Sequence, residues 1–477
     1  MQNFKKTKIV ATLGPTSSNE QLLTKMVKAG VNVVRLNFSH GDYNSHKESI
    51  DIVRRVSKNL DQPIAVLQDI SGPKIRTGDF KSNEIMLKKG KKIILTTKKI
   101  VSDENNIYIN YKRLSKDVAH GSKILLDDGR RELKVLSILG NNVLCRVITG
   151  GVIKGKRGVS LPGVDLKTLS LTNKDLKDIE FGIKQKIDYF ALSFVRTAAD
   201  IKKLSLILDK KKSDARIIAK IETIKAVKNI DEIIEKADGI MVARGDLAVE
   251  LAHEDVPLLQ KDIIEKCNIA GKPVIVATQM LESMIKAPIP TRAETSDIAN
   301  SILDGADAIM LSQETAFGEY PLEAVEIMTA IAKKVENNYL YRGKSIHSGF
   351  ASRELRHNVT ADAITASAVN IARCINAKVI VALTMSGFTP RMISRYRPIQ
   401  PVIAITAHKK HLNKMVLYFG CYPKKIHKFD YVVDTADDIK KILLKNKLAK
   451  KGDKIVIIAG VPLARFRETN LCLVEIL

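Results

Sequence analysis

The chain begins with short apolar runs that alternate with amphipathic stretches. Runs of strand type occupy 8–13, 31–38 and 63–69, and helical patterns fill the intervals at 18–29 and near 43–59. Alternation of buried strands with helices is typical of α/β proteins built on a parallel sheet. The first seventy residues therefore predict three strand–helix units of such a sheet.

The same alternation resumes at Thr172, which is expected to cap a helix. Five further apolar runs follow, at 189–194, 216–222, 239–243, 273–278 and 307–311. Helices are expected after them, at 197–210, near 223–236, and at 253–270, 292–303 and 321–338. Eight strand–helix repeats in total predict a (β/α)8 TIM barrel.

Two regions depart from this pattern. Residues 71–163 contain short alternating segments separated by Gly, Asn and Asp, which predicts an inserted all-β lid domain bounded by Pro73 and Pro162. Residues 345–477 repeat helix–strand units and predict a C-terminal doubly wound α/β domain. The barrel is then formed by 1–70 and 164–341, and residues 342–349 are expected to be a linker.

Charge invites a second class of function. The chain carries 78 basic and 52 acidic residues, a net charge of +26, which suggests nucleic-acid binding. However, tryptophan is absent and aromatic residues make up only 5%, so stacking platforms for single strands are scarce. We favour a lysine-rich background that attracts small anionic metabolites, and we expect no nucleic-acid partner.

The remaining composition bounds the cellular setting. No apolar run approaches the ~20 residues of a membrane span, so no membrane partner is expected. The N-terminus leads straight into the first strand without room for a targeting peptide, which predicts a cytoplasmic protein. Five widely spaced cysteines fit a reducing compartment and disfavour a zinc or iron–sulfur site.

Two strand ends carry the strongest chemical signal. The run RIIAKIE ends in Lys220 and Glu222, which project to the same side of a strand, and DGIMVARGD ends in Gly245 and Asp246. Such charged groups are rarely buried without partners. A salt bridge at a strand terminus is one explanation. A shared site for a divalent cation and an anionic substrate is the interpretation we favour.

Active sites of (β/α)8 barrels lie at the C-terminal ends of the strands, so polar residues that follow the other strands belong to the same candidate site. They are Arg35, Asn37, Ser39, His40, Asp69, Arg76, Thr278, Gln279, Ser312 and Glu314. Carboxylates suit a hard divalent cation, whereas lysine and guanidinium groups suit phosphate. The set predicts metal-assisted phosphoryl transfer.

Ordered motifs along the chain extend this prediction. KIVATLGPTS, VVRLNFSHGD, DISGPKIRTG, IIAKIET, VARGDLAVE and the segment from Ala277 to Pro321 resemble the pyruvate kinase family, in order from about residue 5 to 477. The resemblance implies transfer of the phosphoryl group of phosphoenolpyruvate to ADP, giving pyruvate and ATP, with Mg²⁺ or alternatively Mn²⁺. It also implies a homotetramer.

The resemblance assigns roles to single residues. Glu222 and Asp246 match the divalent-metal ligands, and Lys220 matches the lysine that stabilises the transferring phosphoryl group and the enolate. Arg35 matches the contact to the substrate phosphate. The amides of Gly245 and Asp246, with Thr278, match the clasp on the substrate carboxylate, and Thr278 lies near the site of enolate protonation. Five residues match the nucleotide contacts of the family: Asn37, His40, Arg76, Lys156 and Arg157. Arg76 also matches a catalytic position. Whether Lys156 or Arg157 reaches the nucleotide stays open.

A departure from the family pattern concerns potassium. Family members that use this ion bind it through groups that correspond here to Asn37, Ser39, Asp69 and Ile70. The stretch DISGPKIR places Lys74 nearby, and its ammonium carries the same charge as the ion. We predict activity without potassium. The alternative is that Lys74 is a surface lysine without a role.

The C-terminal domain resembles the regulatory domain of the family. A hydroxyl-rich loop that enters a helix, the type of turn that receives phosphate, contains Thr384, Ser386, Gly387 and Thr389. Arg465 and Arg467 of the last loop either bind an anionic effector or cap the domain.

Rival functions are weaker. The stretch GGVIKGKR nearly fits a P-loop, but Arg157 replaces the Ser or Thr and the following GVSLPG cannot open a helix. A barrel lyase acting on pyruvate-like carbanions would share the lysine, the carboxylates and the threonine, but would have no use for the inserted domain. A basic nucleic-acid-binding protein would have no use for the filled catalytic positions.

Overall fold

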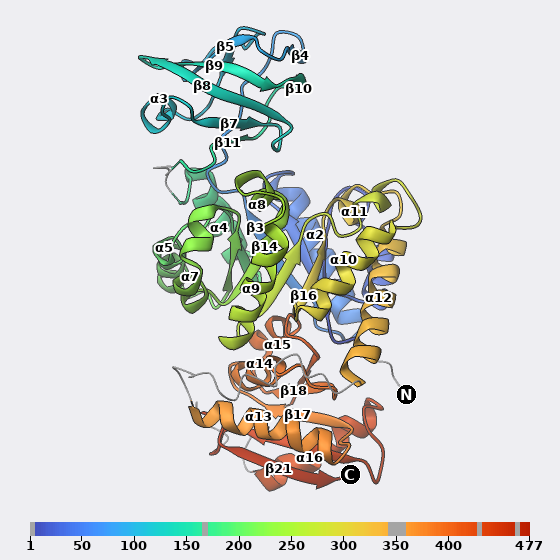
Figure 1. Cartoon of the computed structure of the whole chain (residues 1–477). Coiled ribbons are helices and arrows are strands. Elements are labelled where there is room, and N and C mark those ends of the chain that lie inside the picture. Colours follow the sequence, from blue (N-terminus) through green and yellow to red (C-terminus); the bar gives the residue numbers. More distant parts are fainter. Residues whose placement is uncertain (1–4, 165–169, 342–358, 427–431, 463–467) are drawn as a thin grey trace.

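The computed structural model describes residues 5–164, 170–341, 359–426, 432–462 and 468–477. Arg465, Arg467 and the expected linker at 342–349 lie outside these residues. Figure 1 shows three parts in a row: an all-β domain at one end, a barrel in the middle and an α/β domain at the other end.

The barrel is closed by eight parallel strands in the order β1, β16, β15, β14, β13, β12, β3 and β2. Every run predicted as a barrel strand is one, with ends shifted by at most two residues, which is the usual uncertainty of element boundaries. The strands are β1 (Lys8–Thr12), β2 (Val31–Asn37), β3 (Ala65–Ile70), β12 (Tyr189–Leu192), β13 (Arg216–Ile221), β14 (Gly239–Ala243), β15 (Val274–Ala277) and β16 (Ala308–Leu311).

Seven long helices surround the barrel, as the amphipathic spacing predicts. They are α1 (Glu20–Ala29), α2 (Tyr43–Asn59), α4 (Asn173–Lys184), α5 (Ala198–Lys210), α9 (Val256–Ile269), α10 (Arg292–Leu303) and α12 (Pro321–Tyr341). Thr172 caps α4 as expected, because its side chain accepts a hydrogen bond from the N–H of Asp175.

One helix prediction is wrong in detail. The single helix expected near 223–236 is two short helices, α6 (Ile224–Lys228) and α7 (Ile230–Lys236). Asn229 separates them, and its side chain donates to the carbonyl of Arg196 (3.0 Å). Asparagine favours such breaks because its side chain competes for backbone hydrogen bonds.

The inserted domain is all-β, with one short helix. Six strands form one sheet in the order β11, β7, β8, β9, β5, β6, and β10 pairs with β4. The elements are β4 (Glu84–Leu87), β5 (Lys92–Thr96), β6 (Asn106–Tyr108), α3 (Leu114–Asp117), β7 (Lys123–Leu126), β8 (Arg131–Leu139), β9 (Asn142–Thr149), β10 (Gly151–Lys154) and β11 (Val159–Ser160). A strand follows the P-loop-like stretch, in agreement with the rejection of that motif.

The C-terminal domain has a five-stranded sheet in the order β19, β18, β17, β20, β21, of which only β21 is antiparallel to its neighbour. Its strands are β17 (Val379–Leu383), β18 (Val402–Thr406), β19 (Cys421–Lys425), β20 (Lys454–Ala459) and β21 (Leu471–Ile476). The helices are α13 (Val359–Cys374), α14 (Phe388–Ser394), α15 (Lys409–Met415) and α16 (Val432–Lys445). The strand order reverses between β17 and β20, the kind of point at which ligands bind in open α/β sheets.

A polar seam joins this domain to the N-terminal ends of the barrel strands. The guanidinium of Arg397 donates to both carboxylate oxygens of Asp307 (2.8 and 3.0 Å), and both side chains are buried. Arg216 at the start of β13 donates to the carbonyl of Ser386 (2.7 Å). In the described part of the chain, no helix is long and apolar enough to cross a membrane.

Candidate active site

An ion pair joins the ends of two neighbouring barrel strands. The Nε and Nη2 atoms of Arg35, on β2, lie 2.8 and 2.7 Å from Oδ2 of Asp69, on β3. The Nη1 atom of Arg35 donates to the hydroxyl of Thr12 (2.9 Å). Two N–H groups of the guanidinium converge on one carboxylate oxygen and a third nitrogen binds Thr12, so Arg35 is held in one orientation at the end of the barrel.

Lys220 lies at the centre of the site. Its ammonium contacts Oδ1 of Asp69 (3.2 Å), Oε1 of Glu222 (2.8 Å) and the hydroxyl of Ser193 (2.8 Å). The second oxygen of Glu222 accepts from the N–H of Phe194 (2.7 Å). The structure therefore brings four predicted site residues, from β2, β3 and the end of β13, into one buried cluster: Arg35, Asp69, Lys220 and Glu222.

The charges of this cluster support one another. Burial alone would raise the pKa of Asp69, but the charges of Lys220 and Arg35 lower it to about 2. Burial alone would lower the pKa of Lys220, but Asp69 and Glu222 hold it above its ordinary value. Burial raises the pKa of Glu222, and the neighbouring charge of Asp246 raises it further, against the opposing effect of Lys220. The site thus keeps the positive charge of Lys220 beside the carboxylates of Glu222 and Asp246, which repel each other.

A second group lies where β14 and β15 end. The N–H of Gly245, in the first turn of α8 (Arg244–Glu250), donates to the hydroxyl of Thr278 (2.8 Å). Thr278 has a φ of 72°, which costs a β-branched residue energy and is often found at functional sites. Arg244 holds this backbone by donating to the carbonyl of Thr278 (2.6 Å), while its other nitrogen binds Asp297 (2.6 Å).

Further cations approach the cluster from the beginning of the inserted domain. Burial lowers the pKa of His40, and the charges of Lys74, Arg76 and Arg35 lower it further. The charge of Lys74 also lowers the pKa of Asp69. Lys74 is exposed in the structure, yet it lies close enough to act on the site electrostatically.

The residues of the expected potassium site are neighbours. Asn37 and Asp69 are paired in register across β2 and β3. The side-chain oxygen of Asn37 accepts from the N–H of Ser39 (3.1 Å), and the hydroxyl of Ser39 donates to Ser71 (3.0 Å). Ile70, whose carbonyl was expected to contribute, is buried at the end of β3.

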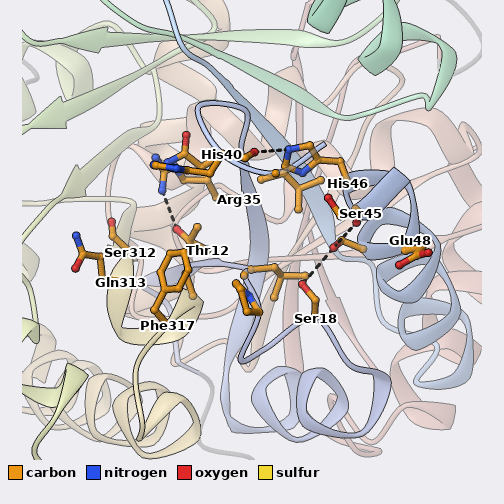
Figure 2. Close-up of a pocket in the computed structure, with 18 of the residues that line it drawn as sticks. Thr12, Ser18, Arg35, His40, Ser45, His46, Glu48, Ser312, Gln313 and Phe317 are labelled. Atoms are coloured by element: carbon orange, nitrogen blue, oxygen red, sulfur yellow. Dashed lines mark hydrogen bonds between the residues drawn. The ribbon is translucent and has the colours of Figure 1, made fainter. Parts of the chain in front are cut away.

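A cavity of about 660 Å³ opens beside Arg35. Figure 2 shows Gln313, Ser312 and Phe317 on the side nearest Thr12, and Ser45, His46 and Glu48 on the other side. Asn37 and His40 line it between these groups. The Nε2 atom of His46 donates to the carbonyl of His40 (2.9 Å). The cavity is large enough for a nucleotide-sized molecule, since ligand pockets span about 300–1,000 Å³.

Other predicted residues lie apart from the cluster. Lys156 pairs with Asp79 (3.0 Å) and Arg157 with Asp127 (3.5 Å), all four within the inserted domain. The hydroxyl-rich loop of the C-terminal domain lies at the opposite end of the barrel, against Arg216. Two hydroxyl groups of that loop already have hydrogen-bond partners in the protein. The hydroxyl of Thr384 accepts from the N–H of Gly387 (2.9 Å), and the hydroxyl of Thr389 contacts that of Thr469 (2.8 Å).

Sequence reasoning missed three residues of the site. Thr12 is the last residue of β1, and Ser193 directly follows β12. The rule applied to the other strand ends would therefore have found both. Arg244 holds Thr278 through a contact between the ends of two strands, which the sequence does not show. Glu314 follows β16 and has a structural role: its carboxylate accepts from the N–H groups of Ser312 (2.7 Å) and Leu281 (3.1 Å).

The donor set fits a hard divalent cation. Burial raises the pKa of the Glu222 carboxyl and the charge of Asp246 raises it further, and a cation bound by both carboxylates would relieve the repulsion between them. Within the residues that the structure describes, no group of three or more His, Cys, Asp or Glu side chains could hold a metal ion. A metal at this site would therefore complete its shell with substrate oxygens and water, as Mg²⁺ usually does.

The fold and this site define a barrel enzyme of the phosphotransferase class, with an inserted β domain and an appended α/β domain. Residues 4–325 match the family profile described as pyruvate kinase, barrel domain, and residues 362–475 match pyruvate kinase, alpha/beta domain. The chain belongs to the pyruvate kinase family, and it catalyses the transfer of the phosphoryl group of phosphoenolpyruvate to ADP, giving pyruvate and ATP.

Individual relatives agree over the full length. Pyruvate kinase of Clostridium perfringens is 43% identical over 479 residues, covering 99% of this chain and 100% of that protein. Pyruvate kinase of Geobacillus stearothermophilus is also 43% identical and covers 99% of this chain and 80% of that protein. The crystal structure of a pyruvate kinase from Cryptosporidium parvum matches with a TM-score of 0.93 at 35% identity, covering 99% of this chain and 96% of that one.

Proposed function

We propose that the buried cluster around Lys220 carries the phosphoryl transfer. The observation that supports this most directly is the triple contact of its ammonium with Asp69, Glu222 and Ser193. A cation fixed in advance at the point where charge develops needs no reorganisation during the reaction. Lys220 would neutralise the transferring phosphoryl group and the enolate oxygen, and Arg35 would hold the substrate phosphate.

Glu222 and Asp246 are proposed to hold Mg²⁺, with Mn²⁺ as a possible substitute because it also prefers oxygen ligands. When bound, such an ion neutralises phosphate charge and orients the groups that react. The two carboxylates supply its protein ligands, and Lys220 remains beside them as the second positive charge.

Thr278 is proposed to take part in the proton transfer to the enolate. Its hydroxyl accepts from the N–H of Gly245 and lies 2.5 Å from the carbonyl of Ala277, which fixes its direction. A water held by this hydroxyl could deliver the proton that converts enolate to pyruvate. The amides of Gly245 and Asp246 are assigned to the substrate carboxylate.

We place the nucleotide in the cavity beside Arg35, with Asn37 and His40 in its wall. Arg76 is assigned to the phosphates, since its charge already acts on His40. Lys156 or Arg157 would reach the nucleotide only if residues 71–163 move toward the barrel. We propose that this domain is a lid whose closure excludes water, which competes for the phosphoryl group.

The ammonium of Lys74 is proposed to replace potassium at the group formed by Asn37, Ser39, Asp69 and Ile70. Its charge acts on Asp69 and His40, although it makes no fixed contact with them. Turnover with tetramethylammonium as the only monovalent cation should equal turnover with potassium. An absolute potassium requirement would overturn this assignment.

The wider setting follows from the family and stays a proposal: a cytoplasmic homotetramer divided at residues 1–70, 71–163, 164–341 and 345–477. The loop containing Thr384, Ser386, Gly387 and Thr389 is the proposed effector site. Its position at the reversal of strand order favours binding of an anionic ligand.

The site assignment is tested by measuring pyruvate release with a lactate-dehydrogenase-coupled assay. Lys220→Met should lower kcat by about 10³-fold or more, whereas Lys220→Arg, which keeps the charge, should retain more activity. Lys202→Met, at an exposed position of α5, is the control. Lys220→Met with unchanged kcat and an unchanged melting temperature would contradict the assignment. Pyruvate release without ADP would favour the lyase function instead.

A further inference from the structure

An exposed aromatic ring lies at the edge of the cavity beside Arg35. Phe317 lines this cavity and is 58% exposed. It directly follows α11 (Gln313–Ala316) and so belongs to the segment after β16. Figure 2 shows its ring on the same side of the cavity as Thr12. Covering such a ring is favourable, so its exposure at a cavity indicates a place where a ligand could cover it.

Exposed aromatic side chains are rare in this chain. Among the described residues, only two aromatic side chains belong to the exposed large hydrophobic ones, Tyr43 and Phe317. Tyr43 has structural partners, because its ring stacks on Phe181 with centroids 4.9 Å apart and its hydroxyl donates to Asp178 (2.8 Å). Within the same described ranges, the ring of Phe317 stacks on no aromatic side chain and carries no cation over its face.

The backbone that carries this ring is fixed. The N–H groups of Phe317 and Gly318 both donate to the carbonyl of Gln313 (3.0 and 2.9 Å). A Cβ atom at Gly318 would lie 2.3 Å from a carbonyl oxygen of α11, and one at Gly14 would lie 2.6 Å from the carbonyl oxygen of Ala316. The turn is therefore packed closely against the segment after β1. A ring on a rigid support loses little conformational entropy when a ligand binds to it.

The cavity has a charged part and an apolar part. Arg35 supplies a cation, and Leu13, Pro15 and Phe317 supply apolar surface from the segments that follow β1 and α11. A nucleoside diphosphate is divided in the same way, with charged phosphates at one end and a flat base at the other. Aromatic side chains stack on the face of a base whatever its identity.

We propose that Phe317 is the platform on which the base of the nucleotide stacks, with the phosphates directed toward Arg35. This inference rests on the proposed placement of the nucleotide in this cavity and adds the group that recognises the base. Because every base has a π face, such a platform accepts all common nucleoside diphosphates. A purine covers more of the ring than a pyrimidine does, so Phe317 determines how strongly the enzyme prefers ADP to UDP.

Steady-state kinetics test the platform first. Phe317→Ser should raise KM for ADP by at least about fivefold and should raise KM for UDP by a smaller factor. The kcat and the KM for phosphoenolpyruvate should stay unchanged, because the ring contacts only the base, which does not react. Phe317→Tyr, which keeps an aromatic face, should retain the KM of the parent protein. Leu206→Ser on α5 is the control, since Leu206 is equally exposed at 58%.

Fluorescence provides a direct test, because the chain contains no tryptophan. Phe317→Trp therefore places a single indole at the edge of the cavity. Its emission should fall when ADP or GDP is added with Mg²⁺, because a stacked base quenches the indole. Inorganic pyrophosphate, which has no base, should leave the emission unchanged. Leu206→Trp, again a single indole at an exposed position, should respond to none of these compounds.

Two results would each overturn the proposal: an unchanged KM for ADP in Phe317→Ser, or unquenched emission of Phe317→Trp at saturating ADP. His40→Ala separates these from a failure of the nucleotide placement. If His40→Ala raises KM for ADP and Phe317→Ser does not, the nucleotide occupies the cavity without stacking on Phe317. If neither raises it, the placement fails as well. A changed oligomeric mass of Phe317→Ser would mean that a second copy of the chain covers the ring, which also contradicts the proposal.

Discussion

The ammonium of Lys220 lies 2.8 Å from a carboxylate oxygen of Glu222, the residue that directly follows the same strand. The side chains are 10% and 2% exposed, so the pair is almost fully removed from water. Breaking one partner of a buried pair is far more costly than its net contribution to stability. The same geometry that positions the cation thus makes Glu222 a sensitive probe of the site.

Glu222→Gln should weaken divalent-metal binding, because it removes one of two carboxylate ligands. We expect the Mn²⁺ dissociation constant, measured by electron paramagnetic resonance without substrates, to rise by at least about tenfold. Glu232→Gln on α7 is the control, since Glu232 is exposed. Unchanged Mn²⁺ binding in Glu222→Gln would remove this residue from the metal site.

Lys74→Ala should make turnover depend on potassium. The substitution removes a positive charge that acts on Asp69 and His40, and a monovalent cation would replace it. The ratio of kcat with potassium to kcat with tetramethylammonium should rise from near one in the parent protein. Lys81→Ala, in the inserted domain and 68% exposed, should leave the ratio unchanged. If Lys74→Ala also leaves it unchanged, Lys74 has no role in ion replacement.

Glu250 should make stability depend on pH. Burial raises the pKa of its carboxyl to about 7, and the charge of Asp246 adds to this rise. The unfolded chain releases the proton near pH 4.3, whereas the folded protein keeps it until about pH 7. The stabilisation is thus full below pH 4.3 and is lost as the pH rises through 7.

The urea midpoint of the parent protein should accordingly fall between pH 5 and pH 8 relative to that of Glu250→Gln, which cannot ionise. The difference in free energy of unfolding should change by at most about 3 kcal/mol. A constant difference between the two proteins across this range would show that the carboxyl of Glu250 titrates normally.

Arg397→Met should loosen the seam between barrel and C-terminal domain. It leaves Asp307 buried, with only the N–H groups of Phe419 and Val274 (both 3.1 Å) as remaining partners among the described contacts. Removing one partner of such a pair costs about 3–5 kcal/mol, which should lower the melting temperature. Arg373→Met, at an exposed position of α13, should have little effect. Equal melting temperatures for both variants would show that the seam depends on other contacts.

The sequence predicted the barrel well because each of its strands is a continuous apolar run ended by polar residues. It could not predict α8 or α11 (Gln313–Ala316), since seven or four residues are too few to show a helical period. The rule that active residues follow barrel strands found Lys220, Glu222 and Asp69. It also selected Glu314, whose carboxylate is satisfied by backbone N–H groups.

Contacts between distant segments were beyond reach from the sequence. That Lys156 and Arg157 face Asp79 and Asp127 depends on the folding of the inserted domain. That Arg216 meets Ser386 depends on how two domains dock. Neither relationship leaves a periodic signal in the residues themselves.

The inserted domain leaves the barrel after β3 and returns before α4, so both of its connections belong to a single barrel loop. Gly72 and Gly163 lie at these two crossings, with φ values of 66° and 75° that side-chain-bearing residues adopt only with strain. All hydrogen-bonded ladders of the domain are its own. A rotation of the inserted domain about Gly72 and Gly163 would therefore break none of the ladder hydrogen bonds that close the barrel.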